Sequence, residues 1–173
     1  MKRIFLIGYM GAGKTTVGKA LAKSMDLSFI DLDVYIENRF RKQISSIFAE
    51  KGEDGFRKIE QNMLHEVSDF EDCVISTGGG TPCFFDNMEY MKQHGTTVYL
   101  QVSVDELASR LEVCKQTRPI LKDKSGEELR RFIAGSLEKR KDYYLRAALV
   151  YDAEQMVSCE DVNTIVSNLQ KLL

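Results

Sequence analysis

The sequence predicts a three-layer α/β fold in which a five-stranded parallel sheet is covered by helices on both faces. Two observations support this prediction. Short apolar segments alternate along the chain with amphipathic helical patterns, as in proteins built from strand–helix–strand crossovers. The first apolar segment, residues 4–7, has no polar alternation, which is typical of a strand that is buried on both faces.

The elements follow one another in a regular order. We expect strands at residues 4–7, 28–31, 73–76, 97–102 and 149–151. We expect helices at residues 14–25, 34–40, 45–51, 56–68 and 86–93, then from residue 105, and at 127–147 and 162–172. The first helix carries Val17, Leu21 and Met25 at four-residue spacing, which gives it one apolar face.

Length and composition bound the domain organisation and the partners. The 173 residues are expected to form a single domain, 1–173, and the hydrophobic content of 43% is that of an ordinary globular protein. A net charge of −2 argues against a nucleic-acid partner. No apolar run approaches the ~20 residues that span a bilayer, and no signal peptide is recognisable, so we expect a cytoplasmic protein with no membrane partner. The four cysteines form no C-x-x-C pair, and we expect reduced thiols.

A glycine-rich motif directly follows the first predicted strand. Residues 8–15, Gly-Tyr-Met-Gly-Ala-Gly-Lys-Thr, fit the P-loop pattern G-x-x-x-x-G-K-[ST]. Backbone N–H groups of such a loop and the N-terminus of the next helix attract phosphate. Lys14 is expected to reach the β- and γ-phosphates, and the Thr15 hydroxyl to bind Mg²⁺. The motif predicts a nucleoside triphosphate site, with these ligands: Gly11, Ala12, Gly13, Lys14, Thr15 and Thr16.

Two aspartates stand at the end of the second predicted strand. Ligands bind outside the carboxyl ends of strands in open α/β sheets, and Asp31 and Asp33 lie there. The third strand ends in Ser76 and Thr77, without the acid that often assists Mg²⁺ in P-loop proteins. One aspartate is therefore expected to serve the water shell of the metal and the other the acceptor hydroxyl. The alternative is that Asp33 only caps the following helix.

Three glycines and three arginines complete the candidate residues. Successive glycines at 78–80 destabilise regular structure, so they suggest a close approach of backbone and ligand, or else a flexible turn before Pro82. Spacing alone favours a surface role for Arg57, four residues after Glu53, and for Arg140 in a charged helical run. Residues 112–126 are polar and form the candidate mobile loop. Arg118, in this loop, fits two interpretations equally well: a lid arginine that closes onto phosphate, or a surface charge.

Taken together, these motifs make the chain similar to shikimate kinases, which are small P-loop kinases of the nucleoside-monophosphate-kinase type. The resemblance extends from the P-loop to about residue 150. The matching positions are residues 8–15; Phe29, Ile30, Asp31, Leu32 and Asp33; Ile36 and Glu37; Gly52, Glu53, Phe56, Arg57 and Glu60; Thr77, Gly78, Gly79 and Gly80; Arg118, Pro119, Ile120 and Leu121; Arg140, Tyr144 and Ala148.

The resemblance implies an activity and roles for some of the matching residues. It implies transfer of a phosphoryl group from ATP to shikimate, with shikimate 3-phosphate and ADP as products, in the chorismate pathway to the aromatic amino acids. Asp33 then contacts the shikimate hydroxyls and takes the proton, and Asp31 assists Mg²⁺ through water. Arg57 and Arg140 pair with the shikimate carboxylate, while Gly79 and Gly80 bind through their backbone. Arg118 closes with the lid onto ATP and acts with Lys14 and Asp33 in catalysis.

The resemblance also gives the fold its name and its parts. It implies a P-loop kinase fold, monomeric, with an acceptor-binding segment at about 32–62 and a mobile lid at about 112–126. The chain departs from the family in two places. Arg140-Lys141-Asp142-Tyr143-Tyr144 lacks the proline of the usual Arg-x-Pro-x-Tyr, and residues 152–156 replace the usual basic stretch with Arg-Asn-Pro. No adenine-binding residues are therefore predicted.

Two other classes of function stay open from the residues. One is a small-molecule kinase of the same fold, such as a gluconate kinase or a nucleoside-monophosphate kinase. The other is a nucleotide-dependent switch or binding module, which would be expected to carry an Asn-Lys-x-Asp guanine motif that the sequence lacks.

Overall fold

The computed structural model describes residues 2–114 and 121–173, and the statements below concern these residues. The strands are β1 (Arg3–Ile7), β2 (Ser28–Asp31), β3 (Cys73–Ser76), β4 (Thr96–Gln101) and β5 (Leu149–Asp152). The helices are α1 (Lys14–Ser24), α2 (Leu32–Phe40), α3 (Ile44–Ser68), the short 3₁₀ helix η1 (Thr81–Cys83), α4 (Asn87–His94), α5 (Val104–Cys114), α6 (Gly126–Tyr144) and α7 (Cys159–Leu172).

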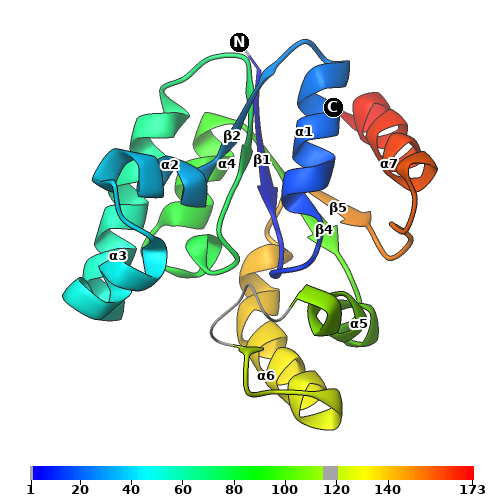
Figure 1. Ribbon diagram of the computed structural model, residues 1–173. Helices are drawn as coiled ribbons and strands as arrows, with labels where there is room; N and C mark the ends of the chain where they lie inside the picture. The colour runs from blue at the N-terminus through cyan, green and yellow to red at the C-terminus, as the bar shows by residue number, and fades with distance from the viewer. Residues whose placement is uncertain (1, 115–120) are drawn as a thin grey trace.

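The five strands form one parallel sheet in the order β2-β3-β1-β4-β5. Helices α1 and α7 pack side by side on one face, and α4 lies on the other (Figure 1). The prediction of a parallel five-stranded sheet between two helical layers is confirmed. The central strand β1 is fully buried, with Ile4, Phe5, Leu6 and Ile7 all at 0% exposure, which agrees with its unbroken apolar sequence.

The position of the site follows from the order of the strands. β1 and β3 are neighbours in the sheet, but the chain leaves β1 for α1 on one face and leaves β3 for α4 on the other. Connections that diverge in this way open a crevice at the carboxyl ends of the two strands, where α/β proteins bind their ligands. The P-loop follows β1, and Gly78, Gly79 and Gly80 follow β3, so both border this crevice.

Helix boundaries differ from the sequence-based expectation in several places. The expected helices at 45–51 and 56–68 form one helix, α3, with a kink at Gly52, whose φ of 68° and ψ of −179° are not helical. Gly55, which lies between the two expected helices, is helical. Helix α2 begins two residues early because Asp31 caps it, and α7 begins at Cys159 because Ser158 and Asp161 form a capping box. Local hydrogen bonds of this kind decide boundaries that apolar periodicity leaves open.

The expected lid, residues 112–126, is only partly described. Residues 112–114 belong to the end of α5, and α6 begins at Gly126, whose φ is 53°. Leu121, just after the gap, is fully buried in the core. Residues 115–120, and Arg118 with them, lie outside the described residues. Among the helices that the structure does describe, none combines the length and apolar character that crossing a membrane would require.

Candidate active site

The P-loop has the conformation that its glycines predict. Gly8, Gly11 and Gly13 have φ angles of 147°, 83° and 94°, a region that side chains rarely adopt. Gly13 caps α1, and the first turn of α1 contains no acidic side chain. The N–H groups of that turn have no acceptor within the helix, and no carboxylate in the turn offsets their partial positive charge. The loop is thus built to receive an anion.

Two side chains of the motif point to different partners. The Lys14 ammonium donates to the carbonyl oxygens of Gly8 at 2.7 Å and Tyr9 at 3.0 Å, so it lies across the mouth of the loop. The Thr15 hydroxyl donates to Asp31 Oδ2 at 2.9 Å. This second contact joins the first turn of α1 to the end of β2 and brings together the two side chains of the Mg²⁺ prediction.

Asp31 and Asp33 differ in their hydrogen bonding to α2. Asp31 is the cap of α2, because its Oδ1 accepts from the N–H groups of Asp33 at 3.1 Å and Val34 at 3.3 Å. The alternative in which Asp33 caps this helix is therefore wrong. Asp33 lies in the first turn of α2, which leaves its carboxylate for another function.

Asp33 has the most perturbed carboxyl group in the crevice. Burial raises its pKa from 3.8 to about 6, with further increases from the charges of Asp31 and Glu60 and a partial offset from Lys14. A carboxylate with a pKa near 6 is a better proton acceptor than an ordinary aspartate and is still ionised at neutral pH. Desolvation together with charged neighbours in a crevice is a pattern found at catalytic sites.

The three glycines at 78–80 leave room for side chains of the site. A Cβ added to Gly78 would lie 2.9 Å from Glu60 Oε1 and 3.2 Å from Asp33 Oδ1. One added to Gly79 would lie 3.2 Å from Arg140 Nη1, and one added to Gly80 would lie 2.7 Å from Arg57 Nη2. Each glycine therefore lets a different charged group approach the same backbone turn. A merely flexible turn would not need this spacing.

Arg57 is held inside the protein and is not a surface charge. Its side chain is 11% exposed, and its Nη1 donates to Oε2 of the buried Glu60 at 2.9 Å. The ion pair with Glu53 that the spacing predicted is present but longer, at 3.5 Å from Nη2. The guanidinium also lies 4.1 Å from the ring centre of Phe84, within the range of a cation–π contact. The preference for a surface role, based on spacing alone, is wrong for this arginine.

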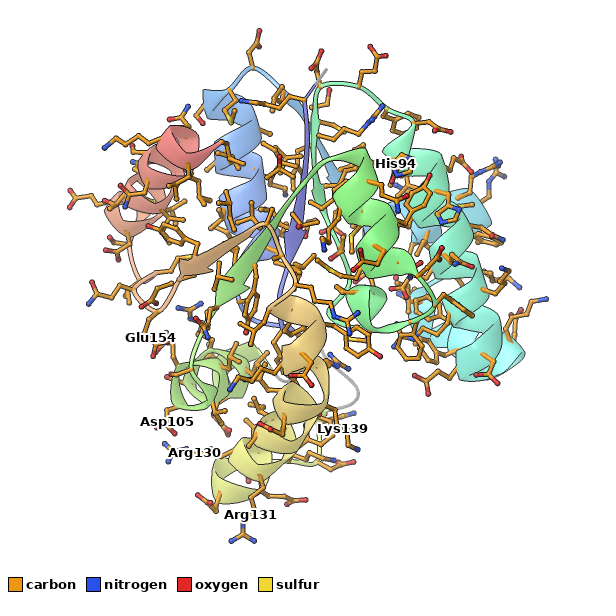
Figure 2. All side chains as sticks on the ribbon, turned by 180° about the vertical axis from the view of Figure 1, so that it is seen from behind. His94, Asp105, Arg130, Arg131, Lys139 and Glu154 are labelled. Carbon is orange, nitrogen blue, oxygen red and sulfur yellow. The ribbon has the colours of Figure 1, made fainter. Side chains whose placement is uncertain are left out.

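Arg140 turns toward the crevice from α6, whereas other basic residues of that helix point outward. Arg131 and Lys139 are exposed and project from the outer side of α6 (Figure 2). Arg140 is half-buried, with its guanidinium carbon 5.3 Å from the ring centre of Tyr9 in the P-loop. Tyr144, one turn later, donates to the Gly79 carbonyl at 2.5 Å and fixes α6 to the glycine turn. A solvated helix face, the other interpretation of the charged run, fits the exposed Lys139 but not Arg140.

Arg57 and Arg140 approach the same glycine turn, and the nearby Cys83 does not neutralise their charges. Cys83 is close enough to both guanidinium groups that each lowers the pKa of its thiol, yet burial outweighs them and raises that pKa to about 11. The thiol is therefore protonated at neutral pH. Two cations lie close to one turn, and among the described residues Arg57 forms ion pairs with Glu60 and Glu53. Such a pair of guanidinium groups is a suitable site for an anionic group of a substrate.

A cavity of about 350 Å³ extends from the P-loop to Asp33 and to the glycine turn, and its lining does not include Arg57 or Arg140. Its lining includes Lys14 and Thr15 from the P-loop, Asp31 and Asp33 from α2 and its cap, and Gly79 from the glycine turn. A larger cleft of about 560 Å³ lies between α6 and the ends of β4 and β5, but it contains none of the predicted residues. Carboxylates of Glu138, Asp152 and Glu154 line that cleft and would repel phosphate, so we assign the nucleotide to the smaller cavity.

Several residues of the site had no assigned role in the sequence. Arg110 donates to the carbonyls of Gly11, Ala153 and Glu154, so it ties the P-loop to the segment after β5. Met156 lines the cavity and lies so close to Gly13 that a Cβ there would overlap it. No motif indicates either residue. Glu60 could have been found, because its spacing of three residues from Arg57 allows an ion pair on one helix face.

The chain contains donors that fit a magnesium ion. Mg²⁺ prefers oxygen ligands, keeps several waters and usually binds only one or two protein groups. The Thr15 hydroxyl and the Asp31 carboxylate, in contact at the P-loop, supply two such oxygens. No cluster of three or more His, Cys, Asp or Glu side chains that could hold a metal occurs in the described part of the chain.

Comparisons with known proteins identify the family of the chain. The family model for shikimate kinase matches residues 10–170. A shikimate kinase of Parabacteroides distasonis is 66% identical over 173 residues and is covered completely, as is this chain. The crystal structure of shikimate kinase from Bacteroides thetaiotaomicron superimposes with a TM-score of 0.96 at 53% identity, covering 99% of this chain and 97% of that one.

A third comparison involves a structure with its ligand. The shikimate kinase of Acinetobacter baumannii in complex with shikimate has a TM-score of 0.86 at 32% identity, covering 99% of this chain and 93% of that one. The family model and the relatives cover nearly the whole sequence, and the family predicted from the ordered motifs is confirmed. The chain belongs to the shikimate kinase family.

Proposed function

We propose that this protein transfers the γ-phosphoryl group of ATP to a hydroxyl of shikimate, giving shikimate 3-phosphate and ADP in the chorismate pathway. The main support is the single cavity that joins a P-loop to Asp33, at the turn where Arg57 and Arg140 converge. A phosphoryl donor site, a proton acceptor and a site for an anion are then combined as the transfer to a hydroxylated carboxylic acid requires. Family membership agrees with this substrate.

The donor side of the site binds the triphosphate. The N–H groups of Gly11, Ala12, Gly13 and the first turn of α1 are arranged to bind the β- and γ-phosphates, with Thr15 and Thr16 in that turn. Lys14 then exchanges the carbonyls of Gly8 and Tyr9 for phosphate oxygens. Its ammonium neutralises charge on the phosphoryl group during transfer, when positioning and electrostatics dominate catalysis.

Asp33 is the proposed proton acceptor. Its raised pKa of about 6 leaves it ionised at neutral pH, and it faces the cavity across from Lys14. The carboxylate accepts the hydrogen bond of the attacking shikimate hydroxyl and takes its proton as the bond to phosphorus forms. The same hydrogen bond directs the oxygen at the γ-phosphorus, which matters because the transition state for phosphoryl transfer is loose.

The carboxylate of shikimate is proposed to lie between Arg57 and Arg140. Glu60 occupies Nη1 of Arg57, which leaves Nη2, 3.5 Å from the exposed Glu53, for an incoming carboxylate. The planar guanidinium of Arg140 approaches from the other side of the glycine turn. The backbone of Gly79 and Gly80 borders the same space, so that it can contact the ring or its hydroxyls.

Magnesium is the proposed cofactor, with Thr15 as ligand and Asp31 acting through a bound water. When bound, it would neutralise and orient the phosphate oxygens of ATP. The Thr15–Asp31 hydrogen bond of 2.9 Å holds both side chains at the phosphate end of the cavity before any ion arrives. Arg118 is proposed as a further ATP contact, on family resemblance alone.

An acceptor comparison tests the proposed function. ADP release, measured by a coupled assay with ATP and Mg²⁺, should be rapid with shikimate and absent with gluconate or AMP. Rapid ADP release with gluconate or AMP instead would identify another small-molecule kinase. Tight ATP binding without ADP release for any acceptor would favour a nucleotide-dependent binding module.

A further inference from the structure

The buried partner of Arg57 has a second hydrogen bond that no motif explains. Glu60 is 1% exposed, and its Oε2 accepts from Arg57 Nη1 at 2.9 Å. Its other oxygen, Oε1, accepts from the hydroxyl of Thr81 at 2.6 Å. Thr81 is 0% exposed, so neither the threonine nor the glutamate can exchange this bond for one to bulk water. The Glu60 carboxylate is thereby fixed at both oxygens.

Thr81 is itself held in place by the turn that follows β3. Its N–H donates to the Gly78 carbonyl at 3.2 Å, and its carbonyl accepts from Asn87 Nδ2 at 2.9 Å. Asn87 is 0% exposed, and its own N–H donates to the carbonyl of Phe84 at 3.2 Å. The hydrogen bonds thus run from α4 through η1 to α3 and end on the guanidinium of Arg57.

This chain of bonds controls the orientation of a carboxylate. A glutamate bound through one oxygen alone can rotate about its terminal torsion, which has a broad energy profile. A second bond, to Thr81, fixes the plane of the carboxylate and with it the position of Nη1. Among the described residues Asn87 Oδ1 and Arg57 Nε have no hydrogen-bond partner, so the carboxylate is held by its two bonds to Arg57 and Thr81 alone. Loss of the Thr81 bond would leave the second oxygen desolvated and without a partner.

The same turn holds the other parts of Arg57. Phe84, three residues after Thr81, stacks on the guanidinium at 4.1 Å, and the absent side chain of Gly80 leaves the space that Nη2 occupies. Arg57 therefore takes its position from the segment 80–84. Of these contacts, that of Thr81 is indirect, because Thr81 binds Glu60 and Glu60 binds Arg57. We propose that Thr81 is a positioning residue for Arg57, acting through Glu60, and that Asn87 holds Thr81 in place.

The proposal deepens the proposed function and rests on it, because Arg57 matters only if an acceptor carboxylate binds there. Thr81 and Asn87 do not touch the substrate, since both side chains are fully buried behind Glu60. Substitutions at Thr81 and Asn87 should therefore change the binding of the acceptor and not that of ATP. A misplaced Arg57 lowers affinity for the carboxylate in the ground state and in the transition state alike, which raises KM and leaves kcat nearly unchanged.

Thr81→Val tests this directly, because valine keeps the shape and removes the hydroxyl. We expect the KM for shikimate to rise about tenfold, the usual effect of one lost hydrogen bond to a charged group. The KM for ATP and kcat should change less than about twofold, because the P-loop is a separate contiguous unit. Thr81→Ser keeps the hydroxyl, so this variant should have the wild-type KM for shikimate. Thr97→Val removes another buried hydroxyl, which accepts from Ala148 N–H, and should leave the KM for shikimate unchanged.

A modified acceptor separates positioning from a general loss of structure. With the methyl ester or amide of shikimate, which lack the anion, Arg57 has no charge to hold. Wild type and Thr81→Val should then have the same KM within about twofold, because the two changes act on one interaction. Equal tenfold differences with shikimate and with its ester would overturn the proposal, as would an unchanged KM for shikimate in Thr81→Val.

The remaining outcomes are also decisive. Thr81→Ala removes the same hydroxyl with a smaller side chain and carries the same expectation if Thr81→Val does not fold. If neither variant folds, the hydroxyl serves the fold and the positioning role is rejected. Wild-type protein that fails to release ADP with shikimate would instead refute the proposed function, and the variants would not be needed to show it.

Discussion

The phosphate side and the acceptor side of the crevice are built in different ways. The phosphate side is one contiguous loop, residues 8–15, whose backbone is proposed to bind the triphosphate and whose conformation depends on three glycines with positive φ. The acceptor side is assembled from distant parts of the chain: Asp33 on α2, Arg57 and Glu60 on α3, the glycine turn after β3, and Arg140 on α6. One side is local in sequence, and the other exists only in the folded protein.

This difference affects how each side tolerates change. Backbone N–H groups cannot be removed by ordinary substitutions, so the loop depends on a few side chains, Lys14 above all. The acceptor side depends on buried ion pairs and hydrogen bonds that support one another, such as Arg57 with Glu60. A single substitution there is expected to reorient neighbours as well as remove its own group. Kinetic measurements on matched variants can therefore test whether the two sides are separate.

Lys14→Met should have the largest effect. Methionine keeps the length of the side chain but removes the positive charge that offsets the negative charge of the phosphoryl group during transfer. We expect kcat to fall by about 10³–10⁵-fold, the range found for arginines that stabilise the same transition-state charge. Lys19→Met, an exposed lysine on the same helix, should be close to wild type. A folded Lys14→Met variant with near-normal kcat would contradict the assignment of the phosphate side.

Asp33→Asn should have the next largest effect. The amide cannot take the proton, and kcat is expected to fall by about 10²–10⁴-fold, the usual range for a positioned general base. Part of the loss would reflect poorer positioning of the hydroxyl, since proton removal can occur late in a loose transition state. Asp54→Asn, an exposed aspartate on α3, is the control. Normal kcat in a folded Asp33→Asn variant would exclude both roles.

Arg57→Ala and Arg140→Ala should weaken the binding of shikimate without affecting the binding of ATP. Truncating one partner of a buried charge pair costs roughly 2–5 kcal/mol, and the lower half of that range corresponds to a rise of about 30- to 300-fold in the KM for shikimate. The KM for ATP should change little. Arg131→Ala, an exposed arginine on α6, should have no effect. A larger loss of ATP affinity than of shikimate affinity would mean that the two sides are not separate.

The change in rate with pH should be the smallest of the four predicted effects. Because burial and the neighbouring acids raise the pKa of Asp33 to about 6, kcat/KM for shikimate should fall about tenfold between pH 7 and pH 5 as this group is protonated. The raised pKa means that the protonated form is favoured in the folded state. The stability that this group contributes is therefore complete below pH 3.8 and is lost as the pH rises through about 6.

Unfolding through Asp33 cannot then explain a lower rate at pH 5. Thermal unfolding measured at both pH values checks this point. An acid limb with its midpoint near pH 4, where an unperturbed aspartate titrates, would show that Asp33 is not the group that controls the rate.

Particular residues show why sequence reasoning succeeded in some places and failed in others. The fully apolar residues 4–7 and the P-loop after them predicted β1, its burial and the phosphate site, because each depends on neighbours in sequence. For Arg57 and Arg140, spacing favoured a solvated surface, and only the family resemblance pointed to the crevice. Spacing describes one helix face, but it does not tell which face meets the glycine turn.

The sequence by itself determined the fold class, the phosphate loop and the family, since these follow from short-range patterns and from motifs in a fixed order. Only the tertiary structure decided that Asp31, and not Asp33, caps α2. It also decided that three glycines make room for Glu60, Arg140 and Arg57 at one turn, and that Thr81 reaches Glu60 from 21 residues away. The physical reason is that burial and hydrogen bonding between distant segments arise only when the sheet brings strand ends together.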